Sequence, residues 1–134
     1  MRVIVTGANG FVGFHTVRAI LDANYDVTAL DVSDSRLRTE FQGNPHCTIA
    51  KADILGDDLE RFIKPGDKVI HLAAVPRFEQ ASQNPQKAVR INVEGTINVI
   101  QACINKKAER LVYSSTGSVY GRNATVPIRE DAMK

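Results

Sequence analysis

Three glycines, each three residues from the next, directly follow a short apolar run near the start of the chain. The run reads Val-Ile-Val-Thr over residues 3–6, and the glycines are Gly7, Gly10 and Gly13. A β-branched strand that leads into a glycine-rich turn and then a helix is how α/β proteins build a pyrophosphate site at a helix N-terminus. Gly7 then allows backbone angles that a Cβ atom disfavours, Gly10 a close approach to phosphates, and Gly13 close packing of helix and strand. The same glycines are also compatible with a turn that binds nothing.

A carboxylate follows where a nucleotide ribose would be recognised. Residues 14–23 predict a helix, residues 25–30 predict a second strand, and Asp31 ends this strand 18 residues after the last of these glycines. Near this spacing, an acid at the tip of the second strand accepts hydrogen bonds from the ribose diol of adenosine. The carboxylate repels a 2′-phosphate, so the pattern favours NAD over NADP, although Arg36 and Arg38 keep NADP open. Asp31 taken alone could also be a solvated turn residue or a helix N-cap.

The composition is that of an ordinary globular domain. The 134 residues are 43% hydrophobic and 24% charged, with a formal net charge of +2, which gives no reason to expect nucleic acid or an anionic membrane as a partner. No apolar stretch approaches the roughly 20 residues of a membrane-spanning helix. Cys47 and Cys103 lie far apart without a CxxC spacing, which indicates no metal site and a reducing compartment. We therefore expect a cytoplasmic protein.

Strand and helix patterns alternate along the whole chain, which predicts an α/β fold with a Rossmann-type, doubly wound parallel sheet. Right-handed crossovers give the strand order 3-2-1-4-5, with the topological switch point between the first and fourth strands. Without a linker or internal repeat, residues 1–134 are expected to form a single domain. The predicted strands cover residues 3–6, 25–31, 47–50, 68–74 and 110–114, the predicted helical segments cover 14–23, 35–41, 59–63 and 85–106, and loops are expected at 75–84 and from Gly117 onward.

Further motifs extend from one end of the chain to the other. In order, they are Thr6-Gly7-Ala8-Asn9-Gly10-Phe11-Val12-Gly13, Asp31, Asp53-Ile54, His71-Leu72-Ala73-Ala74, Asn92-Val93-Glu94-Gly95-Thr96 and Ser114-Ser115-Thr116-Gly117-Ser118-Val119-Tyr120-Gly121. Together they resemble the extended short-chain dehydrogenase/reductases, above all the NAD-dependent epimerase/dehydratase family, which acts on nucleotide sugars. The resemblance implies that the chain is the N-terminal, NAD-binding part of such an enzyme. It would stop before the sixth strand and the C-terminal substrate region.

The resemblance also implies roles for individual residues toward NAD. The backbone of Phe11 and Val12 would hold the pyrophosphate, and Asp31 the adenosine ribose. Asp53 would accept a hydrogen bond from the adenine amino group, with Ile54 against the ring. Asp53 could instead be a solvated loop residue.

At the other end of the cofactor, Ala73 and Ala74 would line the passage past the nicotinamide ribose. Asn92 resembles the helix asparagine that steadies the active-site hydrogen bonds in this family. Thr116 matches the catalytic Ser/Thr, whose hydroxyl binds the reacting oxygen of the substrate. Asn92 could also be an ordinary surface residue and Thr116 a turn hydroxyl, and His71 is read as a packed strand residue outside catalysis.

One pair of residues that the chemistry of this family needs is absent from the sequence. The proton-transfer pair is Tyr-x-x-x-Lys, and none of Tyr25, Tyr113 and Tyr120 has a lysine four positions later. We expect the chain to bind NAD weakly and to catalyse nothing by itself. We also expect homo-oligomers, since the predicted helix over 85–106 would keep an apolar face uncovered. A non-catalytic, NAD-sensing module and an enzyme for a non-sugar alcohol are the alternatives.

Overall fold

Five parallel strands form one sheet with the order β3-β2-β1-β4-β5, as predicted from the sequence. The computed structural model describes residues 1–56, 58–121 and 126–131. The first strand pairs with both of its neighbours, so that Thr6 lies opposite Leu30 on one side and His71 on the other. The strands are β1 (Arg2–Thr6), β2 (Asp26–Asp31), β3 (Cys47–Lys51), β4 (Lys68–His71) and β5 (Arg110–Tyr113).

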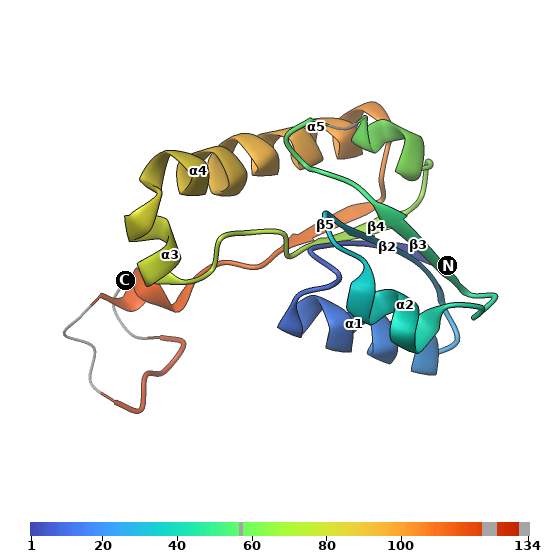
Figure 1. Cartoon of the computed structure of the whole chain (residues 1–134), viewed down its shortest axis with the longest axis horizontal. Helices are drawn as coiled ribbons and strands as arrows, with labels where there is room; N and C mark the ends of the chain where they lie inside the picture. Colours follow the sequence, from blue (N-terminus) through green and yellow to red (C-terminus); the bar gives the residue numbers. More distant parts are fainter. Residues whose placement is uncertain (57, 122–125, 132–134) are drawn as a thin grey trace.

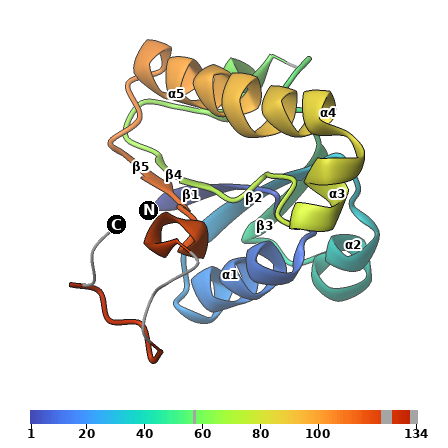
Figure 2. The same ribbon diagram turned by 90° about the vertical axis from the view of Figure 1, so that its left-hand side faces the viewer.

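Helices cover both faces of the sheet, which confirms the doubly wound arrangement (Figures 1 and 2). Two of them, α1 and α2, lie on one face, and α4 and α5 lie on the other in both views. A π-helical segment, η2, joins α4 to α5, so that residues 85–105 form one continuous helix. The helical elements are α1 (Phe11–Asp22), α2 (Ser35–Phe41), η1 (Leu59–Phe62), α3 (Phe78–Gln83), α4 (Pro85–Val89), η2 (Arg90–Gly95), α5 (Thr96–Asn105) and η3 (Gly117–Tyr120).

Alternate residues of β1 supply two separate hydrophobic cores, one on each face of the sheet. Val3 and Val5 belong to the cluster that contains Phe14 of α1, whereas Ile4 belongs to the cluster that contains Val99 of α5. Each of these side chains is at most 7% exposed, and burial of one such side chain contributes about 1.5–3 kcal/mol. Packing on both faces therefore holds β1 in place, and β1 in turn positions the loop that follows Thr6.

The start of the first helix and one segment predicted as a loop differ from the prediction. The first helix begins at Phe11 instead of residue 14, because Gly10 already takes the extended N-cap conformation and its carbonyl accepts from the nitrogen of Phe14 at 2.9 Å. Helix α3 occupies part of the segment predicted as a loop, and Pro76 and Pro85 lie outside it, so neither interrupts it.

Two further differences concern a strand end and a turn, and the remaining bounds agree to within one residue. The fourth strand ends at His71, three residues earlier than predicted, and the chain continues as a loop. A single 3-10 turn, η3, occupies Gly117–Tyr120 within the segment expected to be irregular.

Candidate functional site

The glycine-rich loop between β1 and α1 is closed by contacts that a larger residue would prevent. Gly7 has a φ of +68°, and a Cβ atom there would lie 2.5 Å from the backbone nitrogen of Ala73. A Cβ atom on Gly13 would lie 2.1 Å from the carbonyl oxygen of Gly7. The predicted reason for Gly7 is therefore confirmed, whereas Gly13 allows α1 to pack closely on the loop residues Gly7 and Ala8 and not on the strand itself. Gly10 is less constrained, since its Cβ atom would lie 3.2 Å from that same oxygen, and its approach to phosphates stays a prediction.

The N-terminus of α1 is open to an anion. Within the described residues no side chain caps this 12-residue helix, and its first turn contains no acidic residue. Phe11 and Val12 are 75% and 60% exposed at this end. Free backbone N–H groups and the positive end of the helix dipole favour a negatively charged ligand in this position.

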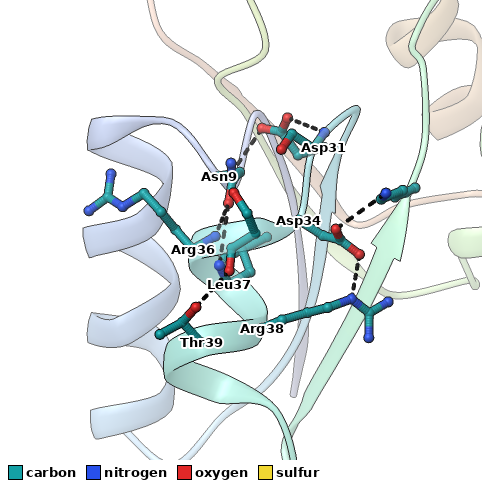
Figure 3. A network of polar contacts seen from close by, with 10 residues as sticks. Asn9, Asp31, Asp34, Arg36, Leu37, Arg38 and Thr39 are labelled. Atoms are coloured by element: carbon teal, nitrogen blue, oxygen red, sulfur yellow. Dashed lines mark hydrogen bonds and ion pairs between the residues drawn. The ribbon is translucent and has the colours of Figure 1, made fainter.

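Asp31 lies beside the same loop, at the tip of β2 (Figure 3). Its Oδ2 accepts from the backbone nitrogen of Asn9 at 3.0 Å, and its Oδ1 accepts from the nitrogen of Ser33 at 3.0 Å. The side chain of Asn9 continues the network, since its Oδ1 accepts from the nitrogens of Arg36 (3.0 Å) and Leu37 (3.3 Å) at the start of α2. Two backbone amides thus orient the carboxylate.

The two arginines that keep NADP open in the sequence have partners in the structure. The guanidinium of Arg36 lies 4.2 Å from the centre of the Phe14 ring, a cation–π contact. Arg38 donates a hydrogen bond to the carboxylate of Asp34 at 2.5 Å (Figure 3). Asp34 also forms an ion pair with Lys51 at 3.5 Å. The hydrogen bond from Arg38 lowers the pKa of Asp34.

The two residues predicted to contact adenine follow β3. Asp53 is exposed, and its Oδ1 accepts from the nitrogen of Leu55 at 2.9 Å. The side chain of Ile54 is 7% exposed and packs on Gly95, where a Cβ atom would lie 2.5 Å from Ile54 Cδ1. Ile54 therefore has a packing role that the sequence did not indicate, and the adenine contacts of both residues stay predictions.

Asn92 connects the long helix to the loop after β4. Its Oδ1 accepts from the backbone nitrogen of Val75 at 2.8 Å, and its Nδ2 donates to the oxygen of Val75 at 3.2 Å. These two hydrogen bonds exclude the interpretation of Asn92 as an ordinary surface residue. They hold in place the segment that contains half-buried Ala73 and exposed Ala74, whose predicted positions next to the nicotinamide ribose remain predictions.

His71 ends β4 and is 1% exposed, which confirms its reading as a packed histidine. Its Nδ1 lies 2.6 Å from the hydroxyl of Thr6, and its Nε2 lies 3.1 Å from the hydroxyl of Thr96. The ring also stacks on Tyr113 with 5.7 Å between the ring centres. Burial lowers the pKa of His71, because the charged imidazolium would lose its hydration.

Thr116 lies after β5 and is exposed. Its Oγ1 accepts from the backbone nitrogen of Ser118 at 3.1 Å and caps the 3-10 turn η3. The turn role that the sequence allows is therefore present in this structure, and the catalytic role stays a prediction.

Sequence reasoning missed three residues that hold this region together: Asn9, Thr6 and Thr96. The sequence carried no usable signal for any of the three, because each joins segments that lie far apart in the chain. Within the described residues, no group of three His, Cys, Asp or Glu side chains could hold a metal ion. None of the helices in the described ranges is long and apolar enough to cross a membrane.

The chain is similar in sequence to sugar-nucleotide epimerases. It is 34% identical over 132 residues to a putative UDP-glucose 4-epimerase of Methanocaldococcus jannaschii, covering 96% of this chain and 43% of that protein. It is 30% identical over 149 residues to the UDP-glucose 4-epimerase of Caenorhabditis elegans, covering 99% and 43%. The chain thus spans less than half the length of these curated relatives.

Solved structures give the same result. The UDP-N-acetylglucosamine 4-epimerase from Methanobrevibacter ruminantium, in complex with UDP-N-acetylmuramic acid, superposes with a TM-score of 0.84 at 32% identity, covering 98% of this chain and 43% of that one. The UDP-glucuronic acid 4-epimerase from Bacillus cereus, in complex with NAD, has a TM-score of 0.82 at 29% identity, covering 99% and 45%. A model of the NAD dependent epimerase/dehydratase family matches residues 3–134. The chain therefore belongs to the NAD dependent epimerase/dehydratase family.

Proposed function

We propose that this chain binds NAD and is the cofactor-binding part of an enzyme that epimerises or dehydrates a nucleotide sugar. The observation that carries the proposal is the uncapped N-terminus of α1 beside the oriented carboxylate of Asp31. The loop between β1 and α1 also fits a dinucleotide. Cβ atoms at Gly7 and Gly13 would clash with the backbone, so these two glycines allow the tight loop that the proposed diphosphate site needs. The related epimerase from Bacillus cereus was solved with NAD.

Each part of the cofactor has a partner in this proposal. The backbone amides of Phe11 and Val12 donate to the diphosphate at the positive end of α1. Asp31 accepts from the adenosine ribose through the lone pairs that its two amide donors do not use. A 2′-phosphate is disfavoured next to this carboxylate. Arg36 and Arg38 support the same choice, since each already has a partner.

The reaction of the complete enzyme would take place at the carboxyl ends of β4 and β5. NAD supplies a hydride acceptor there when it is bound. Asn92 keeps the loop after β4 in position, and the hydroxyl of Thr116 binds the reacting oxygen of the sugar. The related epimerase from Methanobrevibacter ruminantium holds UDP-N-acetylmuramic acid, which supports a nucleotide sugar as the substrate. Because this sequence has no Tyr-x-x-x-Lys pair, the chain alone is proposed to bind NAD without turnover.

The same proposal includes self-association in the cytoplasm. Five apolar side chains along the long helix are 40% to 64% exposed: Val89, Val93, Ile97, Ile100 and Ile104. Their spacing places them on one stripe, beside the face that contains the buried Val99, Ala102 and Cys103. A continuous exposed stripe of this kind favours a protein–protein contact, and a second copy of the chain would bury it. The thiols of Cys47 and Cys103 are free, which suits a reducing compartment.

A non-catalytic dinucleotide-binding module is the second candidate, and it would use the same open N-terminus of α1 and the same oriented Asp31. An enzyme of the extended family that acts on a non-sugar alcohol would use the same cofactor half. Both candidates share the NAD site; in the first nothing reacts there, and in the second an alcohol without a sugar is the substrate.

Calorimetric titration of the purified chain with NAD, NADP and ADP-ribose tests the binding proposal. We expect NAD to bind more tightly than NADP and ADP-ribose to retain binding. Asp31→Asn should reduce the preference for NAD, because the amide keeps an acceptor but not the charge. Equal affinity for NAD and NADP would overturn the cofactor choice, and no binding at about 1 mM of either ligand would overturn the site.

Turnover is tested by incubating the chain with NAD and UDP-glucose while NADH absorbance and sugar products are followed. We expect neither reduced cofactor nor an altered sugar. A sustained rate would contradict the proposal that the chain alone is inactive.

A further inference from the structure

A continuous run of hydrogen bonds crosses the sheet at the switch point between β1 and β4. It begins at Thr6, the last residue of β1, and passes through the ring of His71 to Thr96 in α5. The Thr96 hydroxyl donates to the backbone oxygen of Asn92 at 2.8 Å, and the side chain of Asn92 binds both backbone groups of Val75. The run therefore connects the strand before the glycine-rich loop to the loop after β4.

The donors and acceptors fit together in only one way. The single hydroxyl proton of Thr96 is used toward Asn92, so its oxygen must accept from Nε2 of His71. With the proton on Nε2, Nδ1 of a neutral ring is an acceptor, and the hydroxyl of Thr6 donates to it. The oxygen of Thr6 then accepts from the backbone nitrogen of Leu72 at 3.3 Å. Every group has a partner of the right kind when His71 is neutral and protonated on Nε2.

A second proton on His71 would disturb this arrangement. Both ring nitrogens would then be donors, and the hydroxyl of Thr6 would have to turn away from Nδ1. The groups that contact the ring are the two threonine hydroxyls and the stacked ring of Tyr113, from β1, α5 and β5. Among the described residues, none of the ion pairs brings a carboxylate to His71, so nothing there compensates an added charge.

We propose that neutral His71 is a positioning residue for the cofactor site, setting the separation between the glycine-rich loop and the loop after β4. The proposal rests on the NAD binding proposed above. The two loops almost touch here, since a Cβ atom on Gly7 would lie 2.5 Å from the nitrogen of Ala73. Thr6 directly precedes Gly7, and Val75 closely follows Ala73, so a rearranged His71 ring displaces both walls of the site together. Dinucleotides bind at this switch point in sheets of this kind.

The first test measures the ring directly in the unmodified chain. Nitrogen NMR of the ¹⁵N-histidine-labelled protein reports which ring nitrogen of His71 carries the proton. We expect a neutral ring with the proton on Nε2 at neutral pH. A ring protonated on Nδ1, or a charged ring, would overturn the proposal without any variant having to fold.

The second test measures NAD affinity by calorimetry between about pH 8 and pH 5, with circular dichroism to verify that the chain stays folded. We expect the affinity to stay constant while the ring signal shows a neutral His71 and to fall about three- to tenfold as the ring takes up its second proton, as expected for the loss of one or two internal hydrogen bonds. His71→Gln should bind NAD more weakly at pH 8 and lose this pH dependence. His46→Gln is the matched control, because His46 is exposed and pairs with Asp26 away from the loops, and it should follow the unmodified chain.

Two threonine variants separate positioning from packing. Thr6→Val keeps the shape of the side chain and removes the hydroxyl, so it should weaken NAD binding and alter the ring signal of His71. Thr6→Ser restores the hydroxyl and should restore both. Unchanged NAD affinity in His71→Gln and Thr6→Val would overturn the proposed role of His71 and leave the proposed NAD binding intact. Absence of NAD binding by the unmodified chain at every pH would instead overturn the proposed function, and with it this role.

Discussion

A hydrogen bond joins Asn9 in the glycine-rich loop to Asp31 at the end of β2. The backbone nitrogen of Asn9 donates to Oδ2 of Asp31 at 3.0 Å, and the side chain of Asn9 caps the first amides of α2 (Figure 3). Asn9 belongs to the glycine-rich motif, whereas Asp31 ends the next strand. One residue therefore ties the diphosphate loop to the ribose-binding acid and to the helix that follows it.

Asn9→Ala should weaken both the fold and the site. The variant leaves the amides of Arg36 and Leu37 without their acceptor, which typically costs about 1 kcal/mol of stability. We expect NAD affinity to fall about three- to tenfold as well, because the glycine-rich loop is no longer held to α2. Urea unfolding and calorimetry measure the two effects.

Asn9→Asp supplies the control, since its carboxylate keeps an acceptor oxygen at the same reach and a negative charge is favourable at the N-terminus of α2. It should recover most of the lost stability. Equal stability of Asn9→Ala and the unmodified chain would mean that the Asn9 cap contributes nothing.

Gly13→Ala should be destabilising through close contact in the backbone. Its Cβ atom would lie 2.1 Å from the oxygen of Gly7 and 2.8 Å from Cα of Ala8, and neither is a flexible side-chain end. Overpacking of this kind costs about 1–3 kcal/mol. Gly117→Ala is the matched control, because no atom lies within 4 Å of a Cβ there and no positive φ is required. Thermal melts should show a lower Tm for Gly13→Ala alone.

The sequence predicts the strand order and the steric need for Gly7 and Gly13, and the reasons are local. Short β-branched runs determine the strands, and the spacing from the last glycine to Asp31 reflects one helix and one strand of ordinary length. Gly7 and Gly13 are predictable because each meets an atom of its own loop or of the neighbouring one.

The remaining features depend on contacts that no pattern encodes. Helix α3 has no buried residue, so it has no apolar stripe to reveal it. The run from Thr6 through His71 to Thr96 joins residues 65 and 25 positions apart. The packing of Ile54 on Gly95 likewise needs the folded helix to be in place.

His71 should make stability depend on pH in the mildly acidic range. Its pKa is lowered by burial from the ordinary value of 6.5, so the unfolded chain binds a proton at a higher pH than the folded chain. The stability is fully present above about pH 6.5 and is lost as the pH falls toward the lowered pKa. Urea unfolding at a series of pH values should show this slope, and His71→Gln should lack it.

The carboxylates do not obscure this effect. The pKa values of Asp26, Asp34 and Glu109 are lowered from 3.8, 3.8 and 4.5 by hydrogen bonds from His46, Arg38 and Lys68. Their contributions are lost only as the pH falls below about these ordinary values. A slope that persists unchanged between pH 6.5 and 5 in His71→Gln would contradict the assignment to this histidine.

The exposed stripe on the long helix should control self-association. Ile97 lies near its middle and is 58% exposed, so Ile97→Lys places a charge where a second copy would otherwise bury apolar surface. We expect small-angle scattering to show oligomers for the unmodified chain and monomers for Ile97→Lys. Val32→Lys is the control, since Val32 is 67% exposed in the segment after β2, away from the helix, and should leave the oligomers intact. A monomer at all concentrations of the unmodified chain would reject association through this stripe.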